Sequence, residues 1–334
     1  SRKSPPRFRC AVERPRPRLW LLALLVIVSG LPANRADSQE LTALQQALLI
    51  DQVFVDAIAK AEKSVVAIAR VRVDNGLARR PQLDPLNQLD PFPRRAFTGQ
   101  DNNPFSPDFI PNEFGTGVIV GREGLILTNY HVLGDIKKNE YYVWVKRRPF
   151  KVTAENVKGA DPWSDLAVIK IEANDLQPIS FGDTKNLKKG MSVIALGNPY
   201  AIARDGEVSA SRGMISNLAR TLPPNPNPRN PLWEKETLHH YGTLIQSDAK
   251  LNLGTSGGAL VNLKGEMIGL VTSAAALAGY EKSAGFAIPV DDRFKEIIDK
   301  LKVGRLPEYG FLGVSPDNLS VLDRRRGMFG TRVM

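Results

Sequence analysis

The sequence predicts an all-β fold, either a sandwich or a pair of barrels. From residue 115 onward, short apolar runs alternate with turns rich in Gly, Asp and Asn; the runs include TGVIV, GLILTN, YYVWV, DLAVIKI, SVIALG, GTLIQS, EMIGLVTSA and GFAIP. Short strands at such close spacing are typical of sandwiches and barrels. The composition, 43% hydrophobic and 24% charged over 334 residues, is that of a globular protein and excludes a collagen-like or multi-pass membrane chain.

Residues 1–36 are predicted to act as a signal peptide or a short membrane anchor. A basic segment ends at Arg18 and is followed by the apolar run LWLLALLVIVSG and by LPANRADS, which is the layout of a secretory signal. The apolar segment 19–33 is shorter than the ~20 residues that span a bilayer comfortably. Cleavage near Ala33 or Ala36 and an uncleaved membrane tether through 19–33 both stay open. Either outcome predicts an exported protein.

The next segments are expected to be a helix, a strand and a long loop. Apolar residues recur at three-to-four spacing within 37–63, which indicates an N-terminal amphipathic helix. The run SVVAIARVRV at 64–73 is β-branched and alternating, as in a strand. Residues 74–114 are rich in Pro, Asn, Arg and Asp, and a loop of this length in a compact domain is usually functional or disordered.

The predicted strands divide into two β units. The first spans 64–180 and includes the loop 74–114, and the second spans 181–305 and contains a Pro- and Asn-rich insertion at 223–231. The second unit is expected to end in a closing helix at 291–302, because four apolar residues share one helical face: Phe294, Ile297, Ile298 and Leu301.

The formal net charge of +10 comes from the two ends of the chain. Residues 1–18 carry seven Arg or Lys against one Glu, and residues 323–334 carry four Arg against one Asp, which leaves the body nearly neutral. A nucleic-acid surface spreads its basic residues over a folded face, so no nucleic-acid partner is expected. The one cysteine, Cys10, lies in the leader, which excludes an intrachain disulfide and a Cys-rich zinc site. Neither a metal nor a cofactor is predicted.

Three histidines are the candidates for a near-neutral general base. His131 is expected to end the apolar strand LILTNYHVL, whereas His239 and His240 lie in a polar stretch beside the Pro-rich insertion. Taken alone, a histidine placed like His131 is more often a core residue than a catalyst.

Asp165 and Ser256 are the candidates for a carboxylate and a nucleophile that would act together with His131. Asp165 precedes a buried strand in DPWSDLAVIKI, where a simple turn aspartate would also fit. Ser256 lies in LGTSGGALVN, where the flanking glycines allow either a flexible turn or the inward amide N–H groups of an oxyanion hole. The chain order His, Asp, Ser is that of the two-barrel serine proteases. In such a triad the imidazole takes the serine proton, and the carboxylate orients the imidazole and stabilises its charged form.

Around these residues the sequence resembles the HtrA (Deg) family of trypsin-like serine endoproteases. The matching stretches keep family order from about Ala61 to the end: GTGVIVGREGLILTNYHVL, DPWSDLAVIKI, ALGNPYAIARDGEVSASRGMISNLAR, IQSDAKLNLGTSGGALVNLKGEMIGLVTSA and SAGFAIPVDD. The resemblance implies a chymotrypsin-like double six-stranded β-barrel with His131, Asp165 and Ser256 as catalytic triad. It also implies an oxyanion hole formed by the backbone N–H groups of Gly254 and Ser256.

The resemblance further implies partners, location and regulation. It implies cleavage of unfolded or misfolded exported polypeptides in the periplasm or cell envelope, and homotrimers built through the N-terminal segment. The Phe-containing segment 74–114 resembles a regulatory loop of the family. Residues 306–334 contain YGFLGV, which resembles the start of a PDZ domain. Too few residues follow for a complete one, so an incomplete PDZ start is expected, with a frayed basic tail as the alternative.

Two departures from the family pattern concern the site. Thr255 precedes the nucleophile where the family usually has Asn, and Lys250 stands where the family usually has a small residue. Lys250 and Leu251 are expected at the specificity pocket. Acidic residues before the cut would be favoured if Lys250 enters it, and small aliphatic residues if Lys250 points to solvent. The alternative to a protease is an inactive protease-fold chaperone or scaffold that binds unfolded polypeptides.

Overall fold

The computed structural model describes residues 42–72, 111, 113–198, 207–221, 237–252, 254–272, 285–310, 316–318, 321–328 and 330–333. The predicted leader at 1–36, most of the predicted loop 74–114 and the insertion at 223–231 lie outside these residues. None of the described helices combines the length and the apolar character that crossing a membrane requires.

The first described element is helix α1 (Ala43–Ala61). It begins after Thr42 because Gln45 N–H donates to Thr42 Oγ1 at 3.3 Å and Thr42 N–H donates to Gln45 Oε1 at 2.8 Å. This reciprocal pair is a capping box, which satisfies N–H groups that the first helical turn leaves free. A short 3-10 turn, η2 (Glu62–Ser64), connects the helix to strand β1 (Val65–Arg72).

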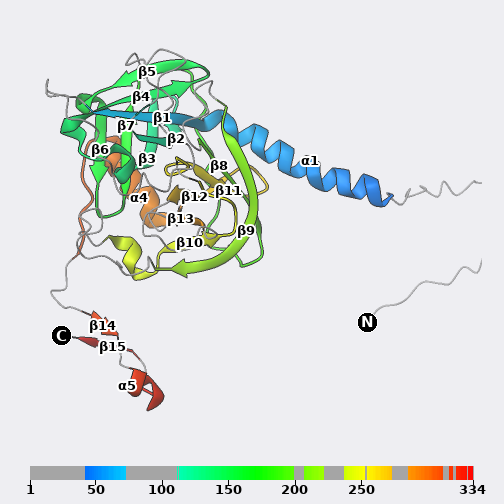
Figure 1. Ribbon diagram of the computed structural model, residues 1–334, viewed down its shortest axis with the longest axis vertical. Helices are drawn as coiled ribbons and strands as arrows, with labels where there is room; N and C mark the ends of the chain where they lie inside the picture. Colours follow the sequence, from blue (N-terminus) through cyan, green and yellow to red (C-terminus); the bar gives the residue numbers. More distant parts are fainter. Residues whose placement is uncertain are drawn as a thin grey trace, which may run out of the picture. The chain divides into compact units, whose positions relative to one another are not determined.

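The first β unit is a seven-stranded antiparallel sheet in the order β5-β4-β1-β2-β3-β7-β6 (Figure 1). Its further strands are β2 (Glu113–Gly121), β3 (Leu125–Asn129), β4 (Asn139–Val145), β5 (Arg148–Val152), β6 (Val157–Asp161) and β7 (Leu166–Lys170). Three short helical turns connect them: α2 (Tyr130–Leu133), η5 (Ile136–Lys138) and η6 (Ala154–Asn156).

The second β unit is a closed barrel in the order β10-β13-β12-β11-β8-β9. Its strands are β8 (Ser192–Gly197), β9 (Ser209–Arg220), β10 (Leu244–Ser247), β11 (Ala259–Val261), β12 (Met267–Thr272) and β13 (Gly285–Pro289), with η9 (Leu238–Tyr241) before β10. The predicted all-β fold with two barrel-like units and an N-terminal helix is therefore confirmed. Only the strand number of the first unit differs, since it has seven strands instead of six.

Two of these seven strands have no counterpart among the apolar runs of the sequence. β5 and β6 are the outer strands of the first sheet. Their sequences, RPFKV and VKGAD, carry charges because an outer strand has one side in water, where charged residues also discourage pairing with other chains. Neither strand therefore produces the apolar run by which the others were predicted.

Side-chain alternation along the strands builds a core that both units share. In β3, Ile126 faces the interior of the first unit, whereas its neighbour Leu127 faces the shared core. In β8, Val193 faces the interior of the second barrel, whereas Ile194 joins the shared core. Successive strand residues point to opposite faces, so each strand contributes both to its own unit's interior and to the shared layer. The two units pack against each other through this apolar layer.

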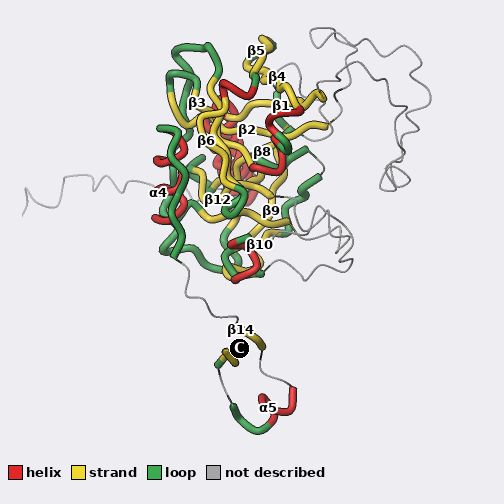
Figure 2. The backbone as a smooth tube through the Cα atoms, turned by 90° about the vertical axis from the view of Figure 1, so that its left-hand side faces the viewer, coloured by secondary structure: helices red, strands yellow, loops and turns green. Residues whose placement is uncertain are grey.

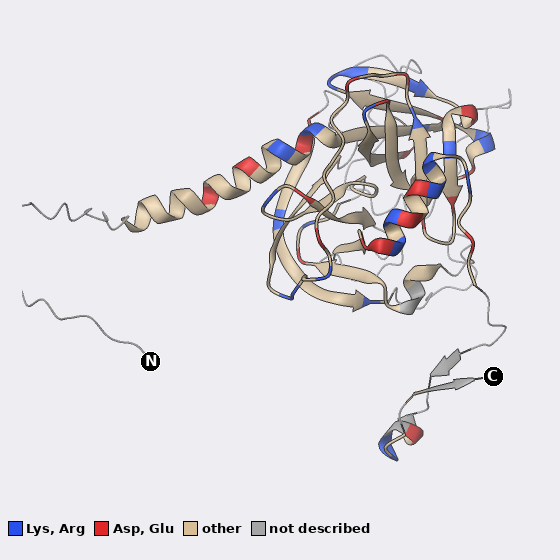
Figure 3. Ribbon diagram, turned by 180° about the vertical axis from the view of Figure 1, so that it is seen from behind, with Lys and Arg blue, Asp and Glu red and all other residues tan. Residues whose placement is uncertain are grey.

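Helix α4 (Asp292–Lys302) follows the second barrel and is visible beside the strands in Figure 2. Its N-cap is Asp291, whose carboxylate accepts the Phe294 N–H at 2.8 Å. The four residues of the predicted apolar face are buried: Phe294, Ile297, Ile298 and Leu301. Charged residues of both signs lie along the rest of the helix (Figure 3).

The C-terminal segment contains the two-stranded pair β14 (Pro316–Asn318) and β15 (Thr331–Val333) and the helix α5 (Val321–Arg325). The expected PDZ-like start at 306–334 stays a prediction.

Candidate active site

His131 and Asp165 come from neighbouring strands of the first sheet. Asp165 directly precedes β7, and β7 pairs with β3, which ends two residues before His131. His131 itself lies in the single helical turn α2 and not in the strand, and Gly134 N–H closes this turn by donating to the Tyr130 C=O at 3.1 Å. The strand register therefore places the imidazole beside the carboxylate.

The Asp165 carboxylate holds His131 at three points. Oδ2 and Oδ1 lie 2.8 and 3.0 Å from His131 Nδ1, and Oδ1 also accepts the backbone N–H of His131 at 3.0 Å. An ionised carboxylate only accepts hydrogen bonds, so Nδ1 carries a proton. In a neutral ring Nε2 is then the basic nitrogen, and this atom is buried without a hydrogen-bond partner among the described residues.

The environment keeps Asp165 ionised. Burial alone raises the pKa of the Asp165 carboxyl, because it disfavours the charged form. The charge and ring hydrogen bond of His131, the charge of His239 and the His131 backbone N–H act in the opposite direction. The balance holds the pKa of Asp165 below its ordinary value, so the carboxylate is available to stabilise an imidazolium.

The backbone at Asp165 is strained. Its φ is 56°, in the left-handed region, which costs a non-glycine residue about 1–3 kcal/mol. The surrounding structure compensates in part, since the Asp165 C=O accepts both the Tyr130 N–H at 3.0 Å and the Asn129 side-chain amide at 3.1 Å. Strain held in place in this way is a common property of functional sites.

Ser256 lies between β10 and β11 and is held by the other β unit. It is 4% exposed, and its C=O accepts the N–H of Thr116, on β2, at 2.8 Å. The Thr116 C=O in turn accepts the hydroxyl of Thr128 at 2.7 Å, three residues before His131. A chain of two hydrogen bonds thus connects the main chain of the serine with the strand that leads to the histidine.

The turn before Ser256 places a glycine in the left-handed region of the backbone. Thr255 N–H donates to the Asn252 C=O at 3.2 Å, and Gly254, the third residue of this turn, has φ of 94°. A positive φ at this position favours glycine, which adopts it without steric cost. Thr116 fixes the turn from the first sheet, because its hydroxyl donates to the Gly254 C=O at 2.7 Å and accepts the Asn198 N–H at 2.8 Å.

Thr116 is a site residue that the sequence patterns did not reveal. In the sequence it is only the first residue of the apolar run TGVIV, yet its backbone N–H and its hydroxyl bind the loop that carries Gly254 and Ser256, the candidate nucleophile. The available signal was a buried polar residue between two glycines, Gly115 and Gly117, in an otherwise apolar strand.

The two residues expected at the specificity pocket differ in burial. Lys250 is exposed, and its backbone N–H donates to Ser211 Oγ at 2.9 Å. Leu251 is half-buried and packs against the core of the second barrel. Asp248, two residues before Lys250 in the sequence, accepts the Met214 N–H at 2.6 Å.

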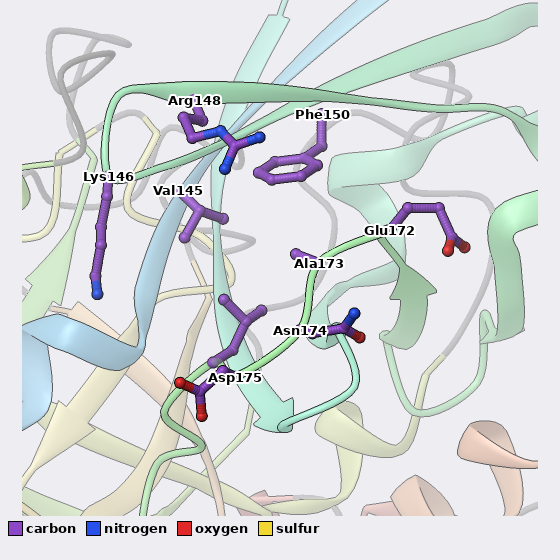
Figure 4. A pocket seen from close by; sticks show the side chains of 9 residues that line it. Val145, Lys146, Arg148, Phe150, Glu172, Ala173, Asn174 and Asp175 are labelled. Carbon is purple, nitrogen blue, oxygen red and sulfur yellow. The ribbon is translucent and has the colours of Figure 1, made fainter.

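A hollow of about 330 Å³ lies away from these residues, between the β4–β5 hairpin and the segment after β7 (Figure 4). Lys146 and Arg148 stand on one side and Glu172 and Asp175 on the other. None of the triad residues lines it. Within the described part of the chain, no three His, Cys, Asp or Glu side chains gather as metal ligands would.

Comparison with known proteins places this geometry in a family. Residues 115–270, which contain the three candidate triad residues, match the trypsin-like peptidase domain. The "probable periplasmic serine endoprotease DegP-like" of Pseudomonas fluorescens is 30% identical over 267 residues, which cover 78% of this chain and 51% of that protein. The "serine protease HtrA-like" of Staphylococcus haemolyticus is 35% identical over 217 residues, which cover 63% of this chain and 32% of that protein.

A solved structure adds the fold. The HtrA-type protease AlgW with a decapeptide superposes with a TM-score of 0.56 at 27% identity, covering 84% of this chain and 78% of that chain. The present chain spans about half or less of the length of the two curated relatives named above. Its two β units, its peptidase-domain match and these relatives agree: the chain belongs to the HtrA/Deg family of trypsin-like serine proteases.

Proposed function

We propose that the protein is a serine endopeptidase that cleaves unfolded or misfolded exported polypeptides through an acyl-enzyme on Ser256. The observation that carries this proposal is the hydrogen-bonded pair of His131 and Asp165, with Nδ1 protonated and Nε2 unoccupied among the described residues, joined through Thr116 to the nucleophile loop. A base prepared in this way is what general-base activation of a serine requires, once Ser256 Oγ comes within hydrogen-bond reach of Nε2.

Each residue has one task in the proposed mechanism. His131 Nε2 takes the proton of Ser256 Oγ as the oxygen attacks the scissile carbonyl, and it later gives that proton to the leaving amine. Asp165 keeps the proton on Nδ1 and stabilises the imidazolium. The backbone N–H groups of Gly254 and Ser256 stabilise the oxyanion, and the positive φ of Gly254, in a tight turn just before Ser256, supports this role. Water then hydrolyses the acyl-enzyme.

The same proposal includes location and assembly. We place the protein in the periplasm or cell envelope, with residues 1–36 as signal peptide or with a membrane tether through 19–33. We expect a homotrimer formed through the N-terminal segment. Exposed apolar side chains on α1 support an interface there: Leu48, Leu49, Ile50 and Val53. Light scattering on the purified protein measures the subunit number, and cell fractionation measures the location.

For specificity we propose a preference for small aliphatic residues before the cut, because Lys250 is exposed and Leu251 packs inward. Mass spectrometry of casein fragments identifies the cut sites. Val, Ala or Ile before the cut, unchanged in Lys250→Ala, is the expected result. A shift away from acidic residues in Lys250→Ala would instead assign the pocket to Lys250.

The activity is tested with unfolded casein and three proteins: wild type, Ser256→Ala and His131→Ala. Loss of a triad member lowers turnover about 10⁴–10⁶-fold. A fluorophosphonate probe that labels wild type and not Ser256→Ala would identify the nucleophile. Binding of casein by wild type with neither cleavage nor labelling would instead indicate the protease-fold scaffold.

A further inference from the structure

A buried histidine that the proposed mechanism does not use contacts the residue before Asp165. His239 is 3% exposed and lies in η9, on the second β unit. Its Nε2 is 3.0 Å from the Ser164 C=O, and its Nδ1 is 3.0 Å from Thr243 Oγ1. A carbonyl oxygen only accepts hydrogen bonds, so His239 Nε2 carries a proton and donates a hydrogen bond to the Ser164 C=O.

We propose that His239 is a positioning residue for the triad. By holding the Ser164 carbonyl it fixes the peptide that leads into Asp165, and thereby the carboxylate that orients His131. This inference rests on the proposed peptidase function, but one of its tests does not depend on peptide cleavage.

The peptide before Asp165 needs such support because Asp165 has a left-handed φ of 56°. Rotation of this peptide would release the backbone strain and turn the carboxylate away from the imidazole. His239 opposes this rotation at the Ser164 C=O. The preceding peptide is held separately, because the Asp161 carboxylate accepts the Ser164 N–H at 3.0 Å. Both polar groups of Ser164's main chain are therefore fixed.

Neighbouring contacts strengthen this support from two directions. Leu238 N–H donates to the Trp163 C=O at 2.9 Å, so η9 binds two successive carbonyls of the loop 161–165. On the other side, the hydroxyls of Ser164 and Tyr309 donate to the Asp161 carboxylate. The loop that ends in Asp165 is thus clamped between the second β unit and the segment after α4.

A histidine at position 239 also favours the ionised form of Asp165. The His239 ring is one of the groups that lower the pKa of Asp165, although burial acts against it and His131 contributes more. A partner that donates to Ser164 and also favours the charged carboxylate serves both orientation and ionisation.

Two polar variants separate positioning from packing. In His239→Gln the side-chain amide reaches the place of Nε2 and keeps a donor for Ser164, whereas in His239→Asn it reaches only toward Thr243. We expect His239→Asn to lower kcat about 10²-fold with KM unchanged, the size of effect that a displacement of about 1 Å causes. His239→Gln is expected to restore most of kcat.

A spectroscopic readout tests the same point without substrate. The proton between His131 Nδ1 and Asp165 gives a strongly downfield ¹H NMR signal, which His131→Ala identifies and which is easy to assign because the chain has three histidines. The signal should persist in His239→Gln and disappear or shift in His239→Asn. If wild type cleaves nothing, the proposed function fails, but this signal still tests His239.

Two further variants keep the proposal falsifiable. Ile268→Val, in the core of the second barrel, is the control for a general loss of stability, and it should lower the melting temperature without lowering kcat. Thr243→Val removes the hydrogen bond that orients the His239 ring and should lower kcat less than His239→Asn does. The proposal is overturned if kcat and the downfield signal are unchanged in His239→Asn or, should that variant not fold, in Thr243→Val. It is also overturned if kcat falls no more in His239→Asn than in a core variant, such as Ile268→Val, that loses the same amount of stability.

Discussion

The two β units carry different parts of the candidate site and hold them in different ways. In the first unit, His131 and Asp165 lie just beyond the ends of two adjacent strands and are joined to each other by three hydrogen bonds. In the second, Ser256 and Gly254 lie in a loop whose carbonyls are held by Thr116 of the first unit. The hydrogen bonds that join the candidate acid–base pair therefore lie within one barrel, whereas the loop of the candidate nucleophile and oxyanion hole is held by the other barrel.

The largest expected effect tests the pair of the first barrel. In Asp165→Asn the shape is kept, but the amide can donate to His131 Nδ1 and so favours the wrong tautomer. We expect kcat to fall about 10⁴-fold while the fold remains intact. Cleavage of a peptide substrate and circular dichroism measure the two quantities. A kcat within tenfold of wild type would mean that this pair does not prepare the base.

The second effect tests the loop of the second barrel. In Gly254→Ala the new Cβ would lie 2.5 Å from the Asn198 carbonyl oxygen and from the Phe114 ring, at a φ of 94°. The turn must then change, and loss of one oxyanion donor lowers kcat about 10²–10³-fold. The downfield His131 signal should stay, because the hydrogen bonds that hold the His131 ring come from Asp165 and not from this loop.

Gly190→Ala is the matched control for this variant. Gly190 also has a positive φ, of 87°, but a Cβ there meets no atom within 4 Å. It should lose stability through backbone strain and retain kcat. Equal losses of kcat in both variants would remove the special role of Gly254.

The third effect tests the dependence of one barrel on the other. Thr116→Val keeps the shape of the side chain but leaves the Gly254 C=O and the Asn198 N–H without their shared partner. An unsatisfied buried group costs about 1–3 kcal/mol of the free energy of unfolding, which urea titration measures. Thr153→Val, at a half-buried turn of the first unit, is the control and should cost less. An equal loss of stability in Thr116→Val and Thr153→Val would mean that the Thr116 hydrogen bonds between the barrels contribute no more than an ordinary turn contact.

The smallest expected effect is on the stability of the fold at acidic pH. Because the pKa of Asp165 is held below its ordinary value, the unfolded chain takes up this proton before the folded one as the pH falls. The stabilisation by the ionised carboxylate is present above the usual aspartate value of about 3.9 and is lost as the pH falls through the folded-state pKa. The stability difference between wild type and Asp165→Asn should therefore shrink from pH 7 to pH 3. A constant difference would show that the carboxylate is not stabilised by its partners.

Local patterns predicted most of the fold, because a buried strand or an amphipathic helix leaves its signature in neighbouring residues. The apolar face of α4 and the strand that precedes His131 were both readable in this way. Chain order also identified the candidate triad. Thr116 bonds to Gly254 over 138 residues, and His239 bonds to Ser164 over 75. Such contacts depend on how two barrels pack, and no local pattern records them.

Hydrogen bonds between the two barrels support the candidate site from both sides. Thr116, on β2 of the first barrel, binds the Ser256 C=O, and His239, in η9 of the second barrel, binds the Ser164 C=O next to Asp165. Neither half can then complete the site before the other has folded. For the proposed protease this order has a protective consequence. A chain that is still folding is itself an unfolded polypeptide among others of its kind, and it gains the ability to cut them only after it has ceased to be a substrate.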